Sequence, residues 1–250
     1  MRIKVTLSYD GTNYSGYQHQ PGEVTVQDTF EDALEVICKE RIKTVASGRT
    51  DGHVHAKGQV LHFDTSIKMK ENNWMRALNS LLPLDIRVKQ VEFVSDDFHA
   101  RFSAIKKEYR YYIKLGEYDL FKNNYSAYYK ELDVDKMDLA INHFIGTHDF
   151  ISFSRFVDKK PTIKTIYEAK INRIDNDMLE IIFIGNGFLK YMVRIMVGTL
   201  IDIGLGKKQI EDINKIFESK DRSKASKTAS PNGLFLYNVW YKEEQIWVIL

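Results

Sequence analysis

Cysteine is almost absent from this chain. Cys38 is the only cysteine among 250 residues, so no disulfide can form within the chain and no cluster of thiolates can hold a metal. Such usage is typical of proteins in a reducing compartment, and we predict a cytoplasmic protein. Proline is also scarce, with 4 residues, and no Pro/Gly-rich linker divides the chain.

Long apolar runs are missing as well. No stretch approaches the ~20 uncharged apolar residues that a membrane span needs. Residues 1–9 alternate basic and apolar side chains rather than forming an apolar block, so they do not resemble a secretion signal. We therefore expect no membrane partner. The net charge of +2 neither requires nor excludes a nucleic-acid partner, because a local basic face matters more than the total.

The hydrophobic pattern indicates an α+β fold. Alternation predicts strands at 2–9, 43–47, 58–65, 86–94, 108–115, 163–174 and 178–184, with closing strands from 235 and from 245. Helical spacing predicts helices after the Thr25–Asp28 capping box and at 73–82, 137–144, 189–203 and 210–217. Strands outnumber helices and several are adjacent in sequence, which favours a mixed, mainly antiparallel sheet with helices on one side.

The segment Ser47-Gly48-Arg49-Thr50-Asp51-Gly52-His53-Val54-His55-Ala56 carries the strongest chemical signal. Its glycines permit a tight turn and the close approach of a bulky ligand. A carboxylate beside a guanidinium stays ionised, which makes Asp51 a candidate catalytic group. The alternative is an ordinary turn in which the aspartate caps its own backbone. The spacing alone leaves both interpretations open.

Three other groups of side chains have two interpretations each. Tyr109 lies in an alternating strand, as a core residue or as a site residue. Arg194 lies in an apolar stretch, where it either pairs with a carboxylate or reaches solvent. The basic residues contact phosphates or face water; they are Arg101, Lys106, Lys107, Arg110, Lys220, Arg222, Lys224 and Lys227. His53, His55 and His62 lack a further ligand at diagnostic spacing, so no metal is expected.

Ordered blocks along the chain resemble the tRNA pseudouridine synthase A family (TruA). The blocks are Tyr9–Thr12, Thr25–Gln27, Gly48–Asp51, Val54–Ala56, Gly58–Val60, Asp97–Ala104, Tyr109–Tyr111, Met192–Arg194, Gly198–Leu200 and Gly233–Leu236. They occur in family order and span essentially the whole chain.

The resemblance implies a reaction and roles for five residues. Uridine in the anticodon stem-loop of tRNA (tRNA positions 38–40) would be isomerised to pseudouridine without a cofactor. Asp51 would be the catalytic carboxylate, and Arg194 its partner. Tyr109 would stack on the uracil and help remove the C5 proton. Arg49 would fill the space that the extruded uridine leaves, and Arg101 would contact the RNA.

The resemblance also implies an architecture. Two α+β halves, similar to ferredoxin-like or RNA-recognition folds, would be joined through their sheets with the active-site cleft between them. The halves would span residues 1–104, with the catalytic loop, and 105–250. The family works as a homodimer, with one tRNA contacting both subunits.

The catalytic loop departs from the family pattern Arg-Thr-Asp-Ala-Gly-Val-His. Gly52 and His53 follow the aspartate, so the glycine is one place early and the position with positive φ could move. Tyr17 stands where the family has tryptophan. These differences leave open a divergent paralogue that binds tRNA without isomerising it. A third interpretation is a glycosidase-like hydrolase that uses Asp51 with a second carboxylate such as Asp10.

Overall fold

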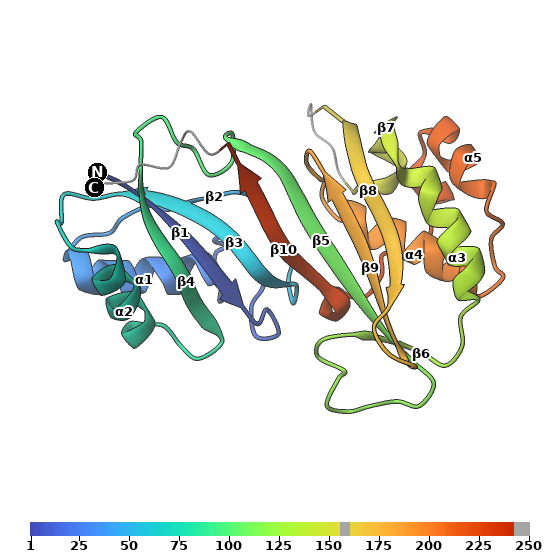
Figure 1. Cartoon of the computed structure of the whole chain (residues 1–250), viewed down its shortest axis with the longest axis horizontal. Helices are drawn as coiled ribbons and strands as arrows, with labels where there is room; N and C mark the ends of the chain where they lie inside the picture. Colours follow the sequence, from blue (N-terminus) through green and yellow to red (C-terminus); the bar gives the residue numbers. More distant parts are fainter. Residues whose placement is uncertain (156–160, 243–250) are drawn as a thin grey trace. The chain divides into compact units, whose positions relative to one another are not determined.

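The computed structural model describes residues 1–155 and 161–242. They contain five α-helices: α1 (Val26–Cys38), α2 (Glu71–Leu81), α3 (Val134–Ile141), α4 (Met192–Gly204) and α5 (Asp212–Ser219). They contain ten strands: β1 (Arg2–Tyr9), β2 (Val45–Ala46), β3 (His55–Asp64), β4 (Ile86–Val94), β5 (Ala104–Leu115), β6 (Ala127–Tyr129), β7 (Gly146–Asp149), β8 (Ile163–Arg173), β9 (Met178–Gly185) and β10 (Leu234–Tyr241). The predicted α+β fold, with mixed and mainly antiparallel strands, is confirmed (Figure 1).

The chain forms two compact units, one of residues 1–106 with the chain from Leu236 onward and one of Lys107–Phe235. The first unit is therefore discontinuous in sequence. The division into halves of residues 1–104 and 105–250 stays a prediction.

In the first unit the strand order is β4–β1–β3–β10. The central strand β1 pairs antiparallel with both β3 and β4. Its alternation places Ile3, Val5 and Leu7 in the core, all fully buried. Helix α2 packs on β4 and α1 packs on α2. The buried face of α2 includes Trp74, whose ring meets that of Phe63 edge-on at 5.6 Å.

Helix α1 begins at the capping box that its sequence indicates. The Thr25 hydroxyl accepts a hydrogen bond from the Asp28 N–H at 3.2 Å, which satisfies one of the unpaired donors of the first turn. Lys39 ends the helix in a left-handed conformation, φ 60°. The buried carboxylate of Glu31 accepts hydrogen bonds from the Thr44 N–H and hydroxyl, which fixes the chain just before β2.

In the second unit the strand order is β5–β9–β8–β7, and β6 lies parallel to β5. Helix α4 is the core element of this unit, since 11 of its 13 residues are buried. Helix α3 packs against α4 and β8. Phe144, Phe150, Phe153 and Phe217 form an aromatic cluster beside them, with ring centroids 4.8–6.2 Å apart.

Several boundaries differ from the prediction. Strand β2 has only 2 residues, and β3 and β5 begin before the predicted residues 58 and 108. Helix α4 starts at Met192 rather than at residue 189, because Tyr191 is left-handed with φ 63° and interrupts the helical backbone. The short strands β6 and β7 were not predicted. The strand predicted from residue 245 lies outside the described residues.

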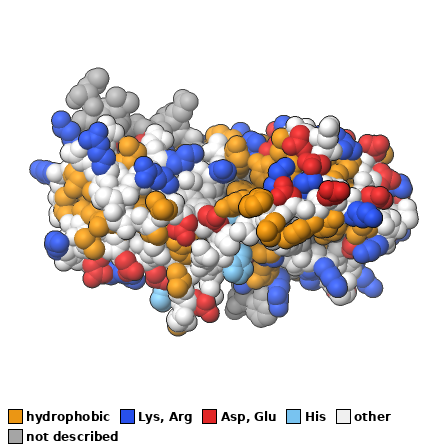
Figure 2. All heavy atoms as spheres, turned by 90° about the horizontal axis from the view of Figure 1, so that it is seen from below, with side chains coloured by type: hydrophobic (Ala, Val, Ile, Leu, Met, Phe, Trp, Pro, Cys, Tyr) orange, Lys and Arg blue, Asp and Glu red, His pale blue; other side chains and the backbone are white. Residues whose placement is uncertain are grey.

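Surface side chains of both charges are intermixed. Figure 2 shows Lys and Arg, Asp and Glu, and hydrophobic side chains interspersed over one face, as expected for a net charge of +2. Among the described residues, no helix is long and apolar enough to cross a membrane.

Candidate active site

The segment from Ser47 to Val54 is a loop that connects β2 to β3 in the first unit. Its base is fixed by Gln59 of β3, which is fully buried. The Ser47 hydroxyl donates to Gln59 Oε1 at 2.8 Å, and Gln59 Nε2 donates to the Gly48 carbonyl at 2.9 Å. Because both ends of one amide are engaged, the entry to the loop has a defined position.

Thr50 anchors the middle of the same loop. Its side-chain oxygen lies 2.8 Å from the hydroxyl of Tyr9, in a buried hydrogen bond. Its carbonyl accepts from the Tyr17 N–H at 3.2 Å. Burial raises the pKa of Tyr9, so this phenol stays neutral. The residue before Asp51 is thus held from both its side chain and its backbone.

Asp51 is half-buried at the tip of this loop. Its carbonyl accepts from the Val54 N–H at 3.2 Å, which closes a turn over Gly52 and His53. Arg49 is exposed and donates to Gln18 Oε1 at 2.9 Å. The arrangement presents one carboxylate and one exposed guanidinium from a loop whose backbone is fixed. Such a loop can hold a carboxylate in a fixed position with little reorganisation.

Two glycines let the chain after β1 pack directly on the loop. A Cβ on Gly11 would lie 2.1 Å from the Val54 carbonyl oxygen. Gly16 has φ +108°, and a Cβ there would lie 2.9 Å from the Thr50 carbonyl oxygen. Glycine is required at both positions, because the backbones touch with no room for a side chain.

The left-handed position of the loop falls at His53, with φ 62°, while Gly52 is not left-handed. This is the place at which the family pattern has its glycine, the residue that adopts a positive φ most readily. His53 is held there by two bonds. Its N–H donates to the Tyr14 carbonyl at 3.1 Å, and its Nδ1 lies 2.8 Å from the Thr12 carbonyl oxygen, to which it donates.

We predict that His53→Ala is less stable than His53→Gly by about 1 kcal/mol. Both variants lose the imidazole bond to Thr12, but only alanine retains the left-handed strain. Urea unfolding of the two variants measures the difference. Adding Gly52→Ala to His53→Gly restores the family order and should be tolerated, because a Cβ on Gly52 would meet Ser15 at an ordinary 3.6 Å. Equal stability of the two His53 variants would contradict the assigned strain.

Two further predicted site residues, Tyr109 and Arg194, belong to the second unit. Tyr109 lies on β5, is 8% exposed, and its ring meets that of Phe188 edge-on at 5.0 Å. Arg194 lies in the first turn of α4, is half-buried, and donates through Nε to the Ala229 carbonyl at 2.8 Å. The predicted pairing of Arg194 with Asp51 stays a prediction.

The segment that holds Arg194 packs tightly on α4. Ala229 donates its N–H to the Arg194 carbonyl at 3.0 Å, in return for the guanidinium bond. One turn further, a Cβ on Gly198 would lie 2.0 Å from the Lys227 carbonyl oxygen. Gly198 therefore allows the close approach that lets residues 227–229 position the arginine.

Arg110, a candidate phosphate contact, is engaged inside its own unit. It donates to Glu108 at 2.6 Å and to Glu180 at 2.8 Å. Burial lowers the pKa of Arg110, but its hydrogen bonds with Glu180 and Glu108 outweigh that effect, so its pKa is raised. Its first role is to satisfy two nearly buried carboxylates.

The predicted RNA contact Arg101 lies on the segment between β4 and β5, in the first unit. Its guanidinium is exposed and lies 5.5 Å from the ring centroid of Phe102. The preceding residue, Ala100, donates its N–H to Nδ1 of the buried His62 at 3.1 Å. A ring nitrogen that accepts a hydrogen bond is unprotonated, so His62 is neutral in this arrangement.

The stability of the protein should decrease as the pH is lowered, because His62 titrates. Burial, with help from the charge of Arg2, lowers the pKa of His62 from 6.5 to about 4. As the pH falls, the unfolded chain therefore binds the proton before the folded chain does. The contribution of neutral His62 to the free energy of unfolding is complete above pH ~6.5. It is lost as the pH falls toward ~4, and the loss amounts to about 3 kcal/mol at most. Urea unfolding from pH 4.5 to 7.5 should show a steeper loss for the wild type than for His62→Asn. Parallel curves would contradict the assignment.

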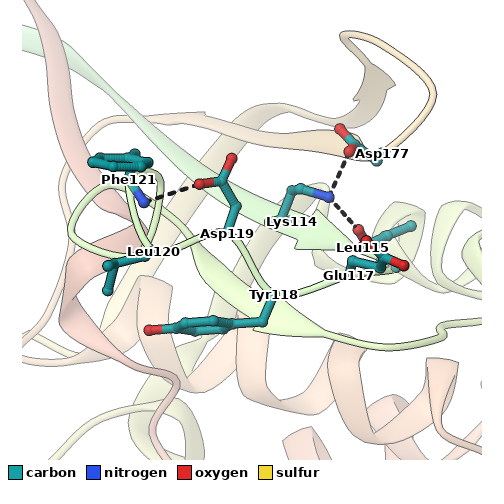
Figure 3. Close-up of a pocket in the computed structure, with 9 residues that line it drawn as sticks. Lys114, Leu115, Glu117, Tyr118, Asp119, Leu120, Phe121 and Asp177 are labelled. Atoms are coloured by element: carbon teal, nitrogen blue, oxygen red, sulfur yellow. Dashed lines mark hydrogen bonds and ion pairs between the residues drawn. The ribbon is translucent and has the colours of Figure 1, made fainter.

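An open pocket of about 510 Å³ lies in the second unit (Figure 3). Its lining residues are Lys114, Leu115, Gly116, Glu117, Tyr118, Asp119, Leu120, Phe121 and Asp177. Lys114 donates to the Leu115 carbonyl at 2.7 Å and pairs with Asp177 at 2.5 Å, so its charge is already compensated. None of the five predicted site residues lines this pocket, and we do not assign the substrate to it.

Among residues 1–155 and 161–242, no group of three or more His, Cys, Asp or Glu side chains is arranged to hold a metal. The sequence interpretation overlooked Gln59, which fixes the loop base, and Phe102, which is exposed beside Arg101. Gln59 lies in the matched Gly58–Val60 block, where a polar residue inside an apolar strand was the available signal. Phe102 lies in the matched Asp97–Ala104 block, from which only the arginine was chosen.

Comparison with known proteins finds a matching family model and relatives that match over nearly the full length of the chain. The family model described as tRNA pseudouridine synthase matches residues 6–103 and 140–242. The tRNA pseudouridine synthase A of Geobacillus sp. (strain WCH70) is 50% identical over 244 residues, which cover 96% of this chain and 98% of the relative. That of Bacillus subtilis (strain 168) is 48% identical over 246 residues, 96% and 99% of the two chains.

A solved H/ACA ribonucleoprotein bound to a substrate RNA containing 2'-deoxyuridine aligns at 11% identity, covering 81% of this chain and 52% of that one. Its TM-score of 0.33 supports no argument. The family model and the near full-length relatives define an RNA-modifying isomerase that acts on uridine in tRNA. Within that class, the chain belongs to the tRNA pseudouridine synthase A family.

Proposed function

We propose that this enzyme isomerises uridine to pseudouridine in the anticodon stem-loop of tRNA, with Asp51 as its catalytic carboxylate. The observation that carries the proposal is the loop itself. Asp51 follows Thr50, which is fixed by Tyr9 and Tyr17, and it lies at the tip of a segment whose base is fixed by Gln59. An aspartate that only capped a turn would not require this buried support.

The reaction needs one group near the sugar carbon C1′. The N1–C1′ bond breaks, the base turns, and a C5–C1′ bond forms; C5 then loses its proton and N1 gains one, so no atom is gained or lost. Bond breaking passes through an oxocarbenium-like state, which an ionised Asp51 stabilises or captures. Removal of a sugar proton by Asp51, giving a glycal-like intermediate, is the other route. Both require an ionised carboxylate shielded from water.

The remaining predicted residues are proposed to act in the same reaction. Tyr109 stacks on the uracil and assists proton removal from C5. Arg194, held by Ala229, keeps the carboxylate ionised. Arg49 is exposed and replaces the extruded base in the RNA stack, while Arg101 contacts the phosphate backbone. We also propose that the enzyme works as a homodimer in the cytoplasm.

Incubation of the purified protein with a uridine-containing anticodon-arm transcript tests the proposal. Chemical mapping should find pseudouridine in the arm at substoichiometric enzyme. Absence of product at stoichiometric enzyme, with the RNA bound, would instead indicate a tRNA-binding paralogue. Free uracil on thin-layer analysis would indicate a hydrolase. Light scattering with and without tRNA measures the oligomeric state.

A further inference from the structure

Phe102 is a large apolar side chain that the first unit leaves in solvent. It is 76% exposed, yet the backbone that carries it is well fixed. The N–H groups of Arg101 and Phe102 both donate to His99 Nδ1 at 3.2 Å. Ser103 closes the turn, with its N–H donating to the His99 carbonyl at 2.9 Å. The fixed turn sets the direction in which the Cα–Cβ bond of Phe102 points.

The ring of Phe102 is part of a stack. The imidazole of His99 lies against it with centroids 4.3 Å apart and planes inclined by 30°. The guanidinium of Arg101 lies 5.5 Å from its centroid. His99 accepts two N–H groups, which requires the neutral imidazole. Phe102, His99 and Arg101, the Phe102 platform, thus join two flat uncharged rings to one cation.

The backbone of Ala100 connects the platform to the rest of the first unit through hydrogen bonds. The Ala100 N–H donates to buried His62 at 3.1 Å, and the Ala100 carbonyl accepts from the Tyr241 hydroxyl at 2.6 Å. Two hydrogen bonds therefore hold the platform against β3, which carries His62, and β10, which carries Tyr241.

A flat aromatic surface with an adjacent guanidinium suits an unpaired nucleobase and its phosphate. Base–aromatic stacking contributes about 1–3 kcal/mol per base and tolerates any base, since every base has a π-face. The guanidinium adds a phosphate contact. Because the turn is fixed before binding, little conformational freedom is lost on stacking.

We propose that the Phe102 platform is a stacking site for an unpaired nucleobase of the tRNA substrate, separate from the target uridine. This proposal depends on the proposed function only in taking tRNA as the RNA that binds. It assigns to Phe102 a part of the binding free energy and no part in the chemistry. The platform therefore acts on the affinity for tRNA rather than on turnover.

Equilibrium binding and saturation kinetics with anticodon-arm RNA test this assignment on Phe102→Ala, Phe102→Trp and Phe121→Ala. Phe102→Ala should raise Kd and KM by about 5- to 100-fold at unchanged kcat, and Phe102→Trp should restore them. Phe121 is 87% exposed in the second unit and serves as the matched control, so its variant should bind like the wild type. Thermal melting should be the same for all four proteins, because neither phenylalanine is packed in the core.

A spectroscopic measurement separates stacking from general affinity. In arms carrying 2-aminopurine at successive unpaired positions, the wild type should quench one position that Phe102→Ala does not. Wild-type affinity in Phe102→Ala, equal loss in Phe102→Trp, or equal loss in Phe121→Ala would each overturn the platform. Failure of the wild type to bind the arm would instead remove the proposed substrate, so the two failures are distinguishable.

Discussion

Replacing Asp51 by asparagine should abolish pseudouridine formation, with a loss of at least ~10³-fold or ~4 kcal/mol of transition-state stabilisation. The substitution removes the negative charge and changes the side-chain volume little. It leaves Thr50 and its bond to Tyr9 in place. The charge is therefore the only quantity that changes greatly. Because C5 gives up its hydrogen in the reaction, tritium release from tRNA labelled at uridine C5 measures the loss directly.

Two controls accompany this prediction: the RNA affinity of the same variant and the activity of a variant at a second carboxylate. The affinity of Asp51→Asn for the anticodon arm should stay within about threefold of wild type, since the amide retains the shape of the loop. Asp10→Asn should retain most activity, because the Asp10 oxygen serves to accept the Thr12 N–H and hydroxyl, which an amide oxygen also accepts. Equal losses in both variants would favour the hydrolase chemistry with two carboxylates. Full activity of Asp51→Asn would remove Asp51 from the mechanism.

Gly198→Ala should destabilise the protein by at least ~3 kcal/mol, although glycine to alanine inside a helix ordinarily stabilises by up to ~1 kcal/mol. The sign reverses because the new Cβ would lie 2.0 Å from the Lys227 carbonyl oxygen, a backbone atom that cannot rotate away. The 227–229 segment must move off α4, which breaks both hydrogen bonds between Arg194 and Ala229. Urea unfolding measures the stability, and turnover should fall with it if Arg194 serves the reaction.

Gly204 provides the matched control within the same helix. A Cβ there would lie 2.7 Å from the sulfur of Met137, the flexible end of a side chain. Met137 can change rotamer, so Gly204→Ala should stay within about 1 kcal/mol of wild type. If Gly198→Ala were as stable as Gly204→Ala, the close packing of residues 227–229 on α4 would be wrong.

The parts of the fold that local sequence determines were predictable. The Thr25–Asp28 capping box located the start of α1, and the hydrophobic pattern located β1 and β4. The start of α4 was placed wrongly because the apolar spacing runs through Tyr191, while the backbone there is left-handed. Periodicity records which face is buried and carries no information on φ. Strands β6 and β7, with 3 and 4 residues, are too short for alternation to be visible.

The residues of the site also divide into those that the sequence indicated and those that it did not. The contiguous turn residues made Asp51 only a candidate, and the resemblance to a family selected it together with the distant Tyr109 and Arg194. The supports were less accessible, because Gln59, Ala229 and Gly198 act through backbone atoms far away in sequence. The positive φ at His53 was also not predictable from the local sequence. It follows from where the Thr12 and Tyr14 carbonyls lie, and the sequence does not encode that position locally.

The discontinuous first unit has a consequence for synthesis on the ribosome. Strand β3, which follows the Asp51 loop, pairs with β1 on one side and with β10 on the other. The residues of β10 that complete the unit, from Leu236, are translated about 130 residues after Lys106, or some 6–25 s later at ordinary elongation rates. During that interval this edge of β3, whose residues are largely buried in the finished fold, is paired only with the two residues of β2. The rest of the edge is open, and an open edge of this kind recruits other strands. Nascent chains of this enzyme should therefore depend on chaperones until the last strand emerges.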